Sequence, residues 1–284
     1  MGIEAGMIEG VNWEELWKKA LLAASWRKRE TDPVRFFDKK ANWYNRTVLK
    51  RTDTIDQMLS RLAIDHGCSV LDIGSGPGTL AIPLARTAGK ITAVEPSGEM
   101  LNHLHENAGK AGINNITTIN KRWEDVVIGK DIKPHDVVIA SHSLAMADIK
   151  EALFKIDQAA TQRVCIFDFA GKPQWDYLDL WPKLYGEVFV HGPNYIFIVN
   201  ILYQMGITAN VEVWEHHGPK QIQSLEDAVR ERVEYFDSPL PSAKAVIREY
   251  LKKNLVTEDD KVMTRRTSKT AMISWKKSTG DREL

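Results

Sequence analysis

Short apolar runs alternate with helical segments through the middle of the chain. The candidate strands are residues 69–73, 90–94, 116–119, 137–140 and 164–167. Between them, apolar residues recur at helical spacing, as in residues 149–160. Apolar strands that alternate with helices are typical of a parallel sheet covered on both faces. The pattern therefore predicts an α/β fold.

Helical segments also flank this region on both sides. Before residue 65, the apolar spacing predicts three helices, over residues 13–21, 36–48 and 53–63. The last third adds helices and two strand candidates, residues 211–214 and 270–275. We therefore expect a helical lead-in over residues 1–65 and a main domain over residues 66–284. Two helical insertions are expected to form a lid or the substrate side of that domain, over residues 172–206 and 218–258.

Composition narrows the possible partners. Lys plus Arg and Asp plus Glu both number 38, so no overall positive field attracts a nucleic acid. The two cysteines, Cys68 and Cys165, cannot form a multi-cysteine zinc site, and no metal is expected. No apolar stretch approaches the roughly 20 residues that span a bilayer. Residues 1–10 lack a basic segment typical of a secretory signal, so we expect a cytoplasmic protein.

A glycine-rich turn carries the most informative chemistry. Gly74, Gly76 and Gly78 follow the strand 69–73 and precede a helical segment, where glycines let a ligand approach the backbone. Glu95 ends the next strand, nineteen residues after Gly76. A carboxylate about 20 residues beyond such a turn binds ribose hydroxyls in nucleotide sites. The spacing predicts a nucleotide-like ligand.

Asp72, two residues before Gly74, indicates which nucleotide is bound. In a NAD site this position lies beside the pyrophosphate, where a second negative charge is repelled. S-adenosylmethionine has no phosphate and presents an ammonium group that a carboxylate can bind. Asp72 therefore argues against a NAD-dependent dehydrogenase and favours S-adenosylmethionine.

Residues 70–79, together with Glu95-Pro96-Ser97, resemble motifs I and II of class I S-adenosylmethionine-dependent methyltransferases. The resemblance extends over roughly residues 36–169. It implies a Rossmann-like sheet of seven strands, the last antiparallel, with 211–214 and 270–275 as strands six and seven. It also implies a cofactor site, whose expected members are Tyr44, Asp72, Gly74, Ser75, Gly76, Glu95, Pro96, Met100, Trp123, Glu124 and Ser141.

One position departs from the family pattern. Members usually carry an acidic residue after strand three that reads the adenine amino group, and Arg122 stands there instead. Either Trp123 stacks on the base while Glu124 or a backbone carbonyl accepts from the amino group, or Trp123 is a core residue.

The expected reaction is an in-line displacement at the sulfonium methyl group, in which the enzyme mainly positions the nucleophile and excludes water. His142, after the fourth strand, is the candidate general base, with a packing role as the alternative. The aromatic residues of the last third favour an apolar or cationic small substrate. The expected substrate residues are Trp181, Tyr185, His191 and Asn194. Asp168, Asp176 and Asp179 are candidates for binding an amine, or are solvated acids.

These observations predict S-adenosylmethionine-dependent methyl transfer to a small molecule. Two alternatives stay open: a methyltransferase acting on tRNA or protein, and a non-catalytic protein that binds S-adenosylmethionine. We do not expect a nucleic-acid partner or a membrane. The acceptor atom and the oligomeric state are open.

Overall fold

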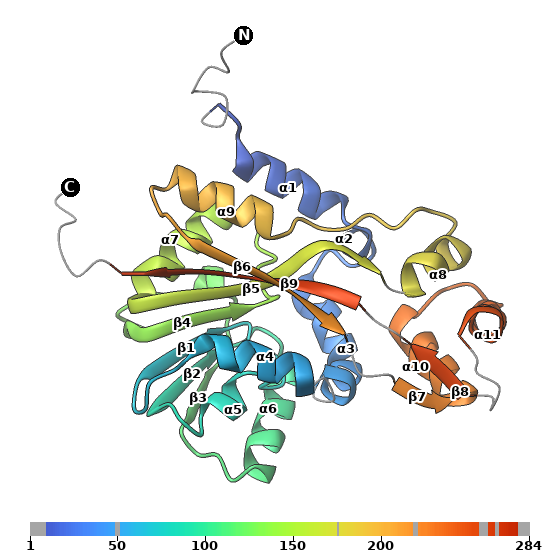
Figure 1. Ribbon diagram of the computed structural model, residues 1–284, viewed down its shortest axis with the longest axis horizontal. Helices are drawn as coiled ribbons and strands as arrows, with labels where there is room; N and C mark the ends of the chain where they lie inside the picture. Colours follow the sequence, from blue (N-terminus) through green and yellow to red (C-terminus); the bar gives the residue numbers. More distant parts are fainter. Residues whose placement is uncertain are drawn as a thin grey trace.

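A seven-stranded sheet runs through the protein in the order β3-β2-β1-β4-β5-β9-β6 (Figure 1). The computed structural model describes residues 10–48, 52–174, 176–217, 221–255, 261–264 and 267–277. The strands of the sheet are β1 (Ser69–Ile73), β2 (Lys90–Val94), β3 (Ile116–Ile119), β4 (His135–Ser141), β5 (Ala160–Gln174), β6 (Asn210–His217) and β9 (Thr267–Lys276).

The sheet is parallel except for one strand. β3, β2, β1, β4 and β5 pair in parallel, while β9 is antiparallel to both β5 and β6. The predicted Rossmann-like sheet is confirmed, and the strand candidates 211–214 and 270–275 are β6 and β9. All five parallel strands end at the same edge, so the turns that follow β1, β2 and β4 lie together.

Helices cover both faces of this sheet. They are α1 (Trp13–Ala23), α4 (Thr52–Leu62), α5 (Ala81–Leu84), α6 (Gly98–Lys110), α7 (Ile149–Ala159) and α9 (Tyr195–Gln204), with a 3-10 turn at Trp123–Asp125. α2 (Ser25–Arg29) and α3 (Pro33–Val48) follow α1 in the chain and add no described residue to the apolar clusters of the sheet. α1, α7 and α9 pack on one face, through residues such as Trp17, Ile156 and Ile201. α4 and α5 pack on the other face, through residues such as Met58 and Leu84.

A second, smaller layer lies beside the sheet, at the right of Figure 1. It contains α8 (Asp176–Tyr185), α10 (Leu225–Phe236), α11 (Ala243–Asn254) and the hairpin of β7 (Gln221–Ser224) with β8 (Lys261–Thr264). These elements share their own apolar cluster, which includes Trp181, Val229 and Leu251. The sequence analysis missed the hairpin because its two short strands are separated by two helices.

The predicted insertion over residues 172–206 differs from the structure in one element. α8 belongs to the smaller layer, but α9 packs on the main sheet beside α1 and α7, burying Ile198, Ile201 and Leu202. A helix of the sheet and a helix of a lid show the same apolar spacing, so only the tertiary contacts distinguish them.

α3 joins the smaller layer to the sheet. The Lys40 ammonium group is buried and donates to the carbonyl oxygens of Glu234 and Tyr235, at 2.8 and 2.7 Å. These carbonyls lie in the last turn of α10, where a positive charge is favourable. Within the smaller layer, Arg232 of α10 forms a buried ion pair with Asp176 at the start of α8. Among the described helices, none is long and apolar enough to cross a membrane.

Candidate functional site

In the glycine turn after β1, Gly74 is tightly packed against a neighbouring segment, whereas Gly76 faces open space. Gly74 and Gly76 have positive φ angles, +70° and +54°, which favour glycine. A Cβ on Gly74 would lie 2.3 Å from Ser143 Cβ, in the segment after β4. A Cβ on Gly76 would meet nothing within 4 Å. The turn therefore packs against the end of β4 at Gly74 and leaves space above Gly76.

Two buried carboxylates flank this turn. Asp72 and Glu95 are 2% and 5% exposed. The Gly76 and Ser97 amides each donate to one oxygen of Glu95, at 2.9 Å. Burial raises the pKa of Glu95, and burial together with the Glu95 charge raises the pKa of Asp72 to about 7. Neither carboxylate forms an ion pair within the described residues, so the arrangement favours a cationic ligand.

Ser75 adds an unpartnered hydroxyl at the same place. Its Oγ is buried and has no hydrogen-bond partner within the described part of the chain. A buried hydroxyl without a partner is unfavourable, so a ligand or a water molecule is expected to bond it. Two carboxylates, a free hydroxyl and an open backbone turn fit the ammonium, carboxylate and ribose of S-adenosylmethionine.

α3 contacts the segment that follows β2, beside the site. The Ser97 hydroxyl donates to Asp38 Oδ1 at 2.5 Å, and the Asp38 charge contributes to the raised pKa of Glu95. The sequence analysis missed Asp38, because its position near Glu95 depends on where α3 docks. Tyr44 lies further along α3, where its ring packs on Phe37 and Trp43. Pro96 follows Glu95 directly, and Met100 is buried in the first turn of α6.

The structure after β3 decides between the two alternatives for Trp123. Trp123 is 2% exposed, its indole N–H donates to the Ala152 carbonyl at 3.2 Å, and the Lys155 ammonium lies 4.9 Å from its ring. Trp123 is therefore a core residue that leaves no ring face for a base, and the stacking expectation is not supported. Glu124 is exposed. Arg122 extends across to α3 and binds Asp32 Oδ1 at 2.6 Å.

The segment after β4 brings the candidate base to the glycine turn. Ser143 Oγ donates to the Ile73 carbonyl at 2.6 Å, so residues 141–143 lie against the turn after β1. His142 is exposed and has a φ of +52°, a left-handed conformation that is strained for a residue with a Cβ. Its Nδ1 lies 3.1 Å from Ser141 Oγ, and its ring is 4.5 Å from that of Phe169. Strained residues are frequent at functional sites.

All four predicted substrate residues make contacts within the protein. Trp181 is buried in the smaller layer, and the Tyr185 hydroxyl donates to the Phe236 carbonyl. Asn194 caps the N-terminus of α9, accepting from the Ile196 amide at 3.1 Å. His191 is exposed, with its ring 4.9 Å from that of Phe189. Trp181 therefore lies in the core of the smaller layer, whereas Tyr185 is half-buried, packs against that core and carries the Arg29 guanidinium over its ring.

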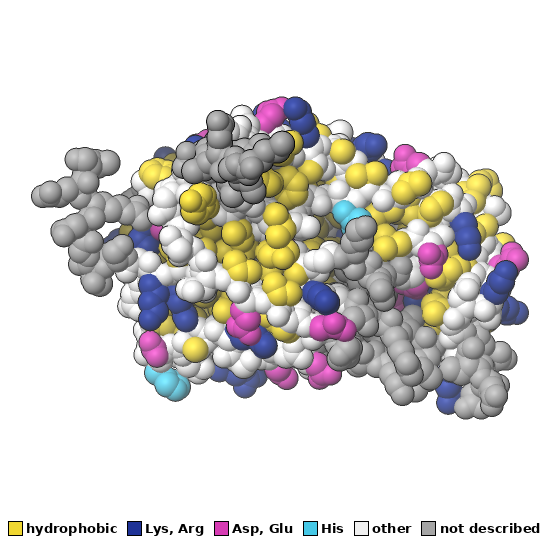
Figure 2. Space-filling model, turned by 45° about the horizontal axis from the view of Figure 1, so that its top comes forward, with side chains coloured by type: hydrophobic (Ala, Val, Ile, Leu, Met, Phe, Trp, Pro, Cys, Tyr) yellow, Lys and Arg dark blue, Asp and Glu magenta, His cyan; other side chains and the backbone are white. Residues whose placement is uncertain are grey.

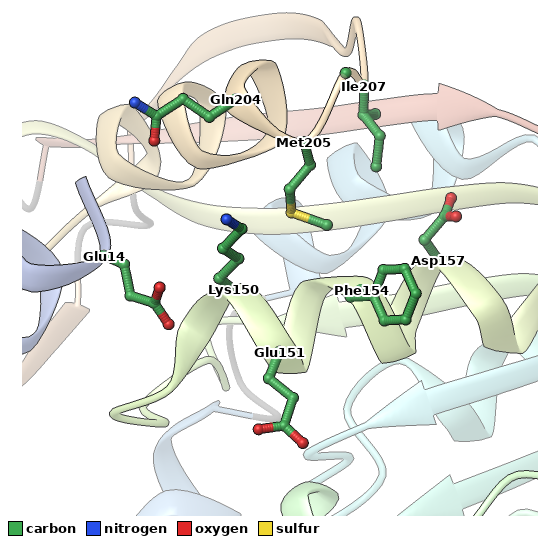
Figure 3. Close-up of a pocket in the computed structure, with 9 residues that line it drawn as sticks. Glu14, Lys150, Glu151, Phe154, Asp157, Gln204, Met205 and Ile207 are labelled. Carbon is green, nitrogen blue, oxygen red and sulfur yellow. The ribbon is translucent and has the colours of Figure 1, made fainter. Parts of the chain in front are cut away.

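The structure contains a pocket that lies apart from this site. A pocket of about 670 Å³ is lined by residues of α1, α7 and the end of α9, among them Glu14, Lys150 and Met205 (Figure 3). It includes none of the predicted site residues. Within the described residues, no group of three or more His, Cys, Asp or Glu side chains is placed to bind a metal ion.

Comparison with known proteins agrees with this geometry. Residues 70–161 match the family model described as a methyltransferase domain, and this segment contains the glycine turn, Glu95 and His142. The chain belongs to the class I S-adenosylmethionine-dependent methyltransferases. Its cofactor is therefore S-adenosylmethionine, as predicted.

Relatives of this methyltransferase are known in sequence and in structure. An uncharacterised protein of Haemophilus influenzae is 32% identical over 222 residues, which are 78% of this chain and 80% of that protein. Ribosomal RNA small subunit methyltransferase G of Corynebacterium glutamicum is 40% identical over 78 residues, covering 27% of this chain and 35% of that protein. The Bacillus subtilis YcgJ structure has a TM-score of 0.54 at 13% identity, over 81% of this chain and all of that chain, which shows the shared fold.

Proposed function

We propose that this methyltransferase acts on a small molecule, with the cofactor held at the turn after β1. The observation that supports the site is the pair of buried carboxylates, Asp72 and Glu95, beside an open glycine turn. S-adenosylmethionine, when bound, supplies the activated methyl group. The remaining work falls to the protein: to bind both reactants, align them and exclude water.

Each polar group of the cofactor has a partner in this proposal. Asp72 binds the ammonium group, directly or through water, and the Ser75 hydroxyl with the turn at Gly74 and Gly76 binds the methionine carboxylate. Glu95 accepts hydrogen bonds from the ribose hydroxyls with the lone pairs that its two backbone partners leave free. Pro96 and Met100 line the adenine side, and Ser141 and Tyr44 close the site from β4 and α3.

We further propose that Asp32 takes the place of the missing acid after β3. Arg122 stands at that position and binds Asp32 Oδ1, while the Val34 amide donates to the same oxygen at 3.1 Å. Asp32 directly precedes α3, and Asp38, within that helix, accepts a hydrogen bond from Ser97 at the end of β2. α3 thus extends from the end of β2 to the end of β3, where the adenine follows the ribose. Asp32 Oδ2 accepts the adenine amino hydrogen, a role that the sequence analysis gave to Glu124 or a backbone carbonyl.

His142 is the proposed general base. Its neighbour Ser143 contacts the cofactor turn, and its own ring is exposed, so a bound acceptor can reach it. A neutral imidazole can accept the proton that an oxygen or nitrogen nucleophile releases.

A small acceptor is favoured over RNA by the distribution of charge. On the face shown in Figure 2, Lys and Arg side chains are scattered toward the periphery, whereas hydrophobic side chains gather in the middle. Arg122, at the end of β3, is already paired with Asp32, and Arg61 of α4 is paired with Glu212 at 2.8 Å. RNA binding requires a continuous positive surface for the phosphates.

Calorimetric titration with S-adenosylhomocysteine, with NAD as the control, tests the cofactor site. We expect micromolar binding of S-adenosylhomocysteine alone, and binding should be lost in Asp72→Ala. Methyl transfer to a small-molecule panel, compared with bulk tRNA at low and high salt, then tests the acceptor. Transfer to tRNA that falls steeply with salt would contradict the small-molecule assignment.

A further inference from the structure

Three acidic residues of the β5–α8 region differ in whether the protein itself provides them with a partner. Asp176 forms the buried ion pair with Arg232. Asp179 accepts a hydrogen bond from the Tyr250 hydroxyl at 2.9 Å. Asp168 has neither an ion pair nor a side-chain hydrogen bond to another side chain within the described residues, and its Oδ1 accepts only from the adjacent Phe169 amide, at 2.8 Å.

Asp168 lies at the edge of the sheet that carries the candidate site. It follows Phe167, the last residue of β5 that pairs with β4, and its own pairing partner is Ala271 of β9. The two residues beside it both contact His142. The His142 amide donates to the Phe167 carbonyl at 2.8 Å, and the Phe169 ring packs against the imidazole. Asp168 therefore lies on the strand between two residues that contact the candidate base, while its own side chain points to the other face.

The N-terminal end of α9 lies at the same edge of the sheet as Asp168. α9 connects β5 to β6, which is parallel to β5, so the helix begins where β5 ends. Successive side chains of a strand point to opposite faces. Phe167 packs on the α4 and α5 face, so Asp168 points to the face that carries α1, α7 and α9. The loop that contains His191 and Asn194 leads into α9 on this side.

Asp168 is half-buried, so its carboxylate is partly removed from water and is less stable as an isolated anion than in solvent. Burial raises the pKa of Asp168 to about 7, opposed only by the hydrogen bond from Phe169. A buried charge is stable when an opposite charge faces it. Phe169, which is 40% exposed, is the next residue of the strand, so its ring lies on the opposite face, against the His142 imidazole.

We propose that Asp168 binds the protonated nitrogen of an amine substrate, which makes the acceptor an aliphatic or arylalkyl amine. This inference rests on the proposed function, because it identifies the acceptor of the same reaction. The ammonium group transfers one proton to Asp168 or to His142. The nitrogen lone pair then forms the new bond to the methyl carbon, and the electrons of the broken carbon–sulfur bond stay on sulfur. The products are a methylated ammonium ion and neutral S-adenosylhomocysteine.

Two matched probes test this assignment. The protein is saturated with S-adenosylhomocysteine and titrated with 2-phenylethylamine and with 2-phenylethanol, which differ in the charged group. We expect the amine to bind at least tenfold more tightly. Asp168→Asn keeps the shape of the side chain and is expected to abolish this preference. Asp125→Asn, at an exposed acid outside the site, is the control and is expected to retain it.

A second measurement does not depend on affinity alone. The side-chain carboxyl carbon of Asp168 is followed by NMR, assigned by its absence in Asp168→Asn, as the pH is raised with and without the amine. Amine binding is expected to shift its titration to lower pH. Equal affinity for the two probes, including no binding of either, or an amine preference that survives in Asp168→Asn, would overturn the proposal. Failure of S-adenosylhomocysteine itself to bind would instead count against the proposed cofactor site.

Discussion

Glu95 Oε2 accepts a hydrogen bond from the Gly76 amide, with 2.9 Å between oxygen and nitrogen. This contact joins the end of β2 to the turn after β1, so one carboxylate both shapes the turn and lies at its open side. The two residues are nineteen positions apart in sequence, and parallel pairing of β1 with β2 brings them together.

Replacing Glu95 tests its role in the cofactor site. Glu95→Ala is expected to weaken S-adenosylhomocysteine binding at least tenfold, since hydrogen bonds to a charged group contribute about 1.5–3 kcal/mol. Calorimetry measures the change, with Glu99→Ala, an exposed residue of α6, as the control. Unchanged affinity in Glu95→Ala would remove Glu95 from the ribose site.

Replacing Asp72 is expected to have opposite effects on cofactor binding and on the stability of the folded protein. Its pKa is raised to about 7 in the folded protein from an ordinary value of 3.8, so the folded state holds the proton longer than the unfolded state. The stability contributed by this group is complete below pH 4 and is lost as the pH rises toward 7. Asp72→Asn should therefore stabilise the ligand-free protein more at pH 8 than at pH 5, as measured by urea denaturation.

The same residue is expected to bind the cofactor only when ionised. Wild-type affinity for S-adenosylhomocysteine should rise between pH 6 and pH 8, through the pKa of about 7 of Asp72. In Asp72→Asn the affinity should be low and nearly independent of pH. A wild-type affinity that stays flat across this range would contradict the ammonium contact.

The left-handed backbone of His142 allows its chemical and structural roles to be separated. His142→Gly and His142→Ala should both slow methyl transfer and leave S-adenosylhomocysteine affinity unchanged. Glycine has no Cβ to strain at a φ of +52°, so the glycine variant should be more stable than the alanine variant by about 1 kcal/mol. Equal turnover in wild type and both variants would leave His142 with a packing role only.

Asp32 is expected to distinguish adenine from hypoxanthine. S-inosylhomocysteine carries an oxygen where S-adenosylhomocysteine carries the amino group, and it offers Asp32 no such donor. Wild type should bind the adenine form at least tenfold more tightly, and Asp32→Ala should reduce that ratio. Glu124→Ala is the matched test of the earlier expectation. If only the Glu124 variant lost discrimination, the adenine contact would belong to Glu124.

The order of elements and the cofactor chemistry are encoded locally in the sequence. Strand positions follow from short apolar runs, because a strand buried on both faces needs apolar residues throughout. The proximity of Asp72 and Glu95 also follows from local features, since Asp72 lies near the end of β1, Glu95 directly follows β2, and parallel strands end at one edge. These features require no knowledge of how distant helices dock.

Tertiary structure alone decided the surroundings of that site. The docking of α3 brings Asp38, and Asp32 just before the helix, to strand ends that lie about 60 or more residues further along the chain, through contacts with Ser97 and Arg122. α8 and α9 have the same helical spacing, yet α9 packs on the sheet and α8 in the smaller layer. Tertiary packing also buries the aromatic rings of Trp123 and Trp181. Periodicity shows that a residue faces apolar surroundings, but packing determines whether those surroundings are a core or a ligand.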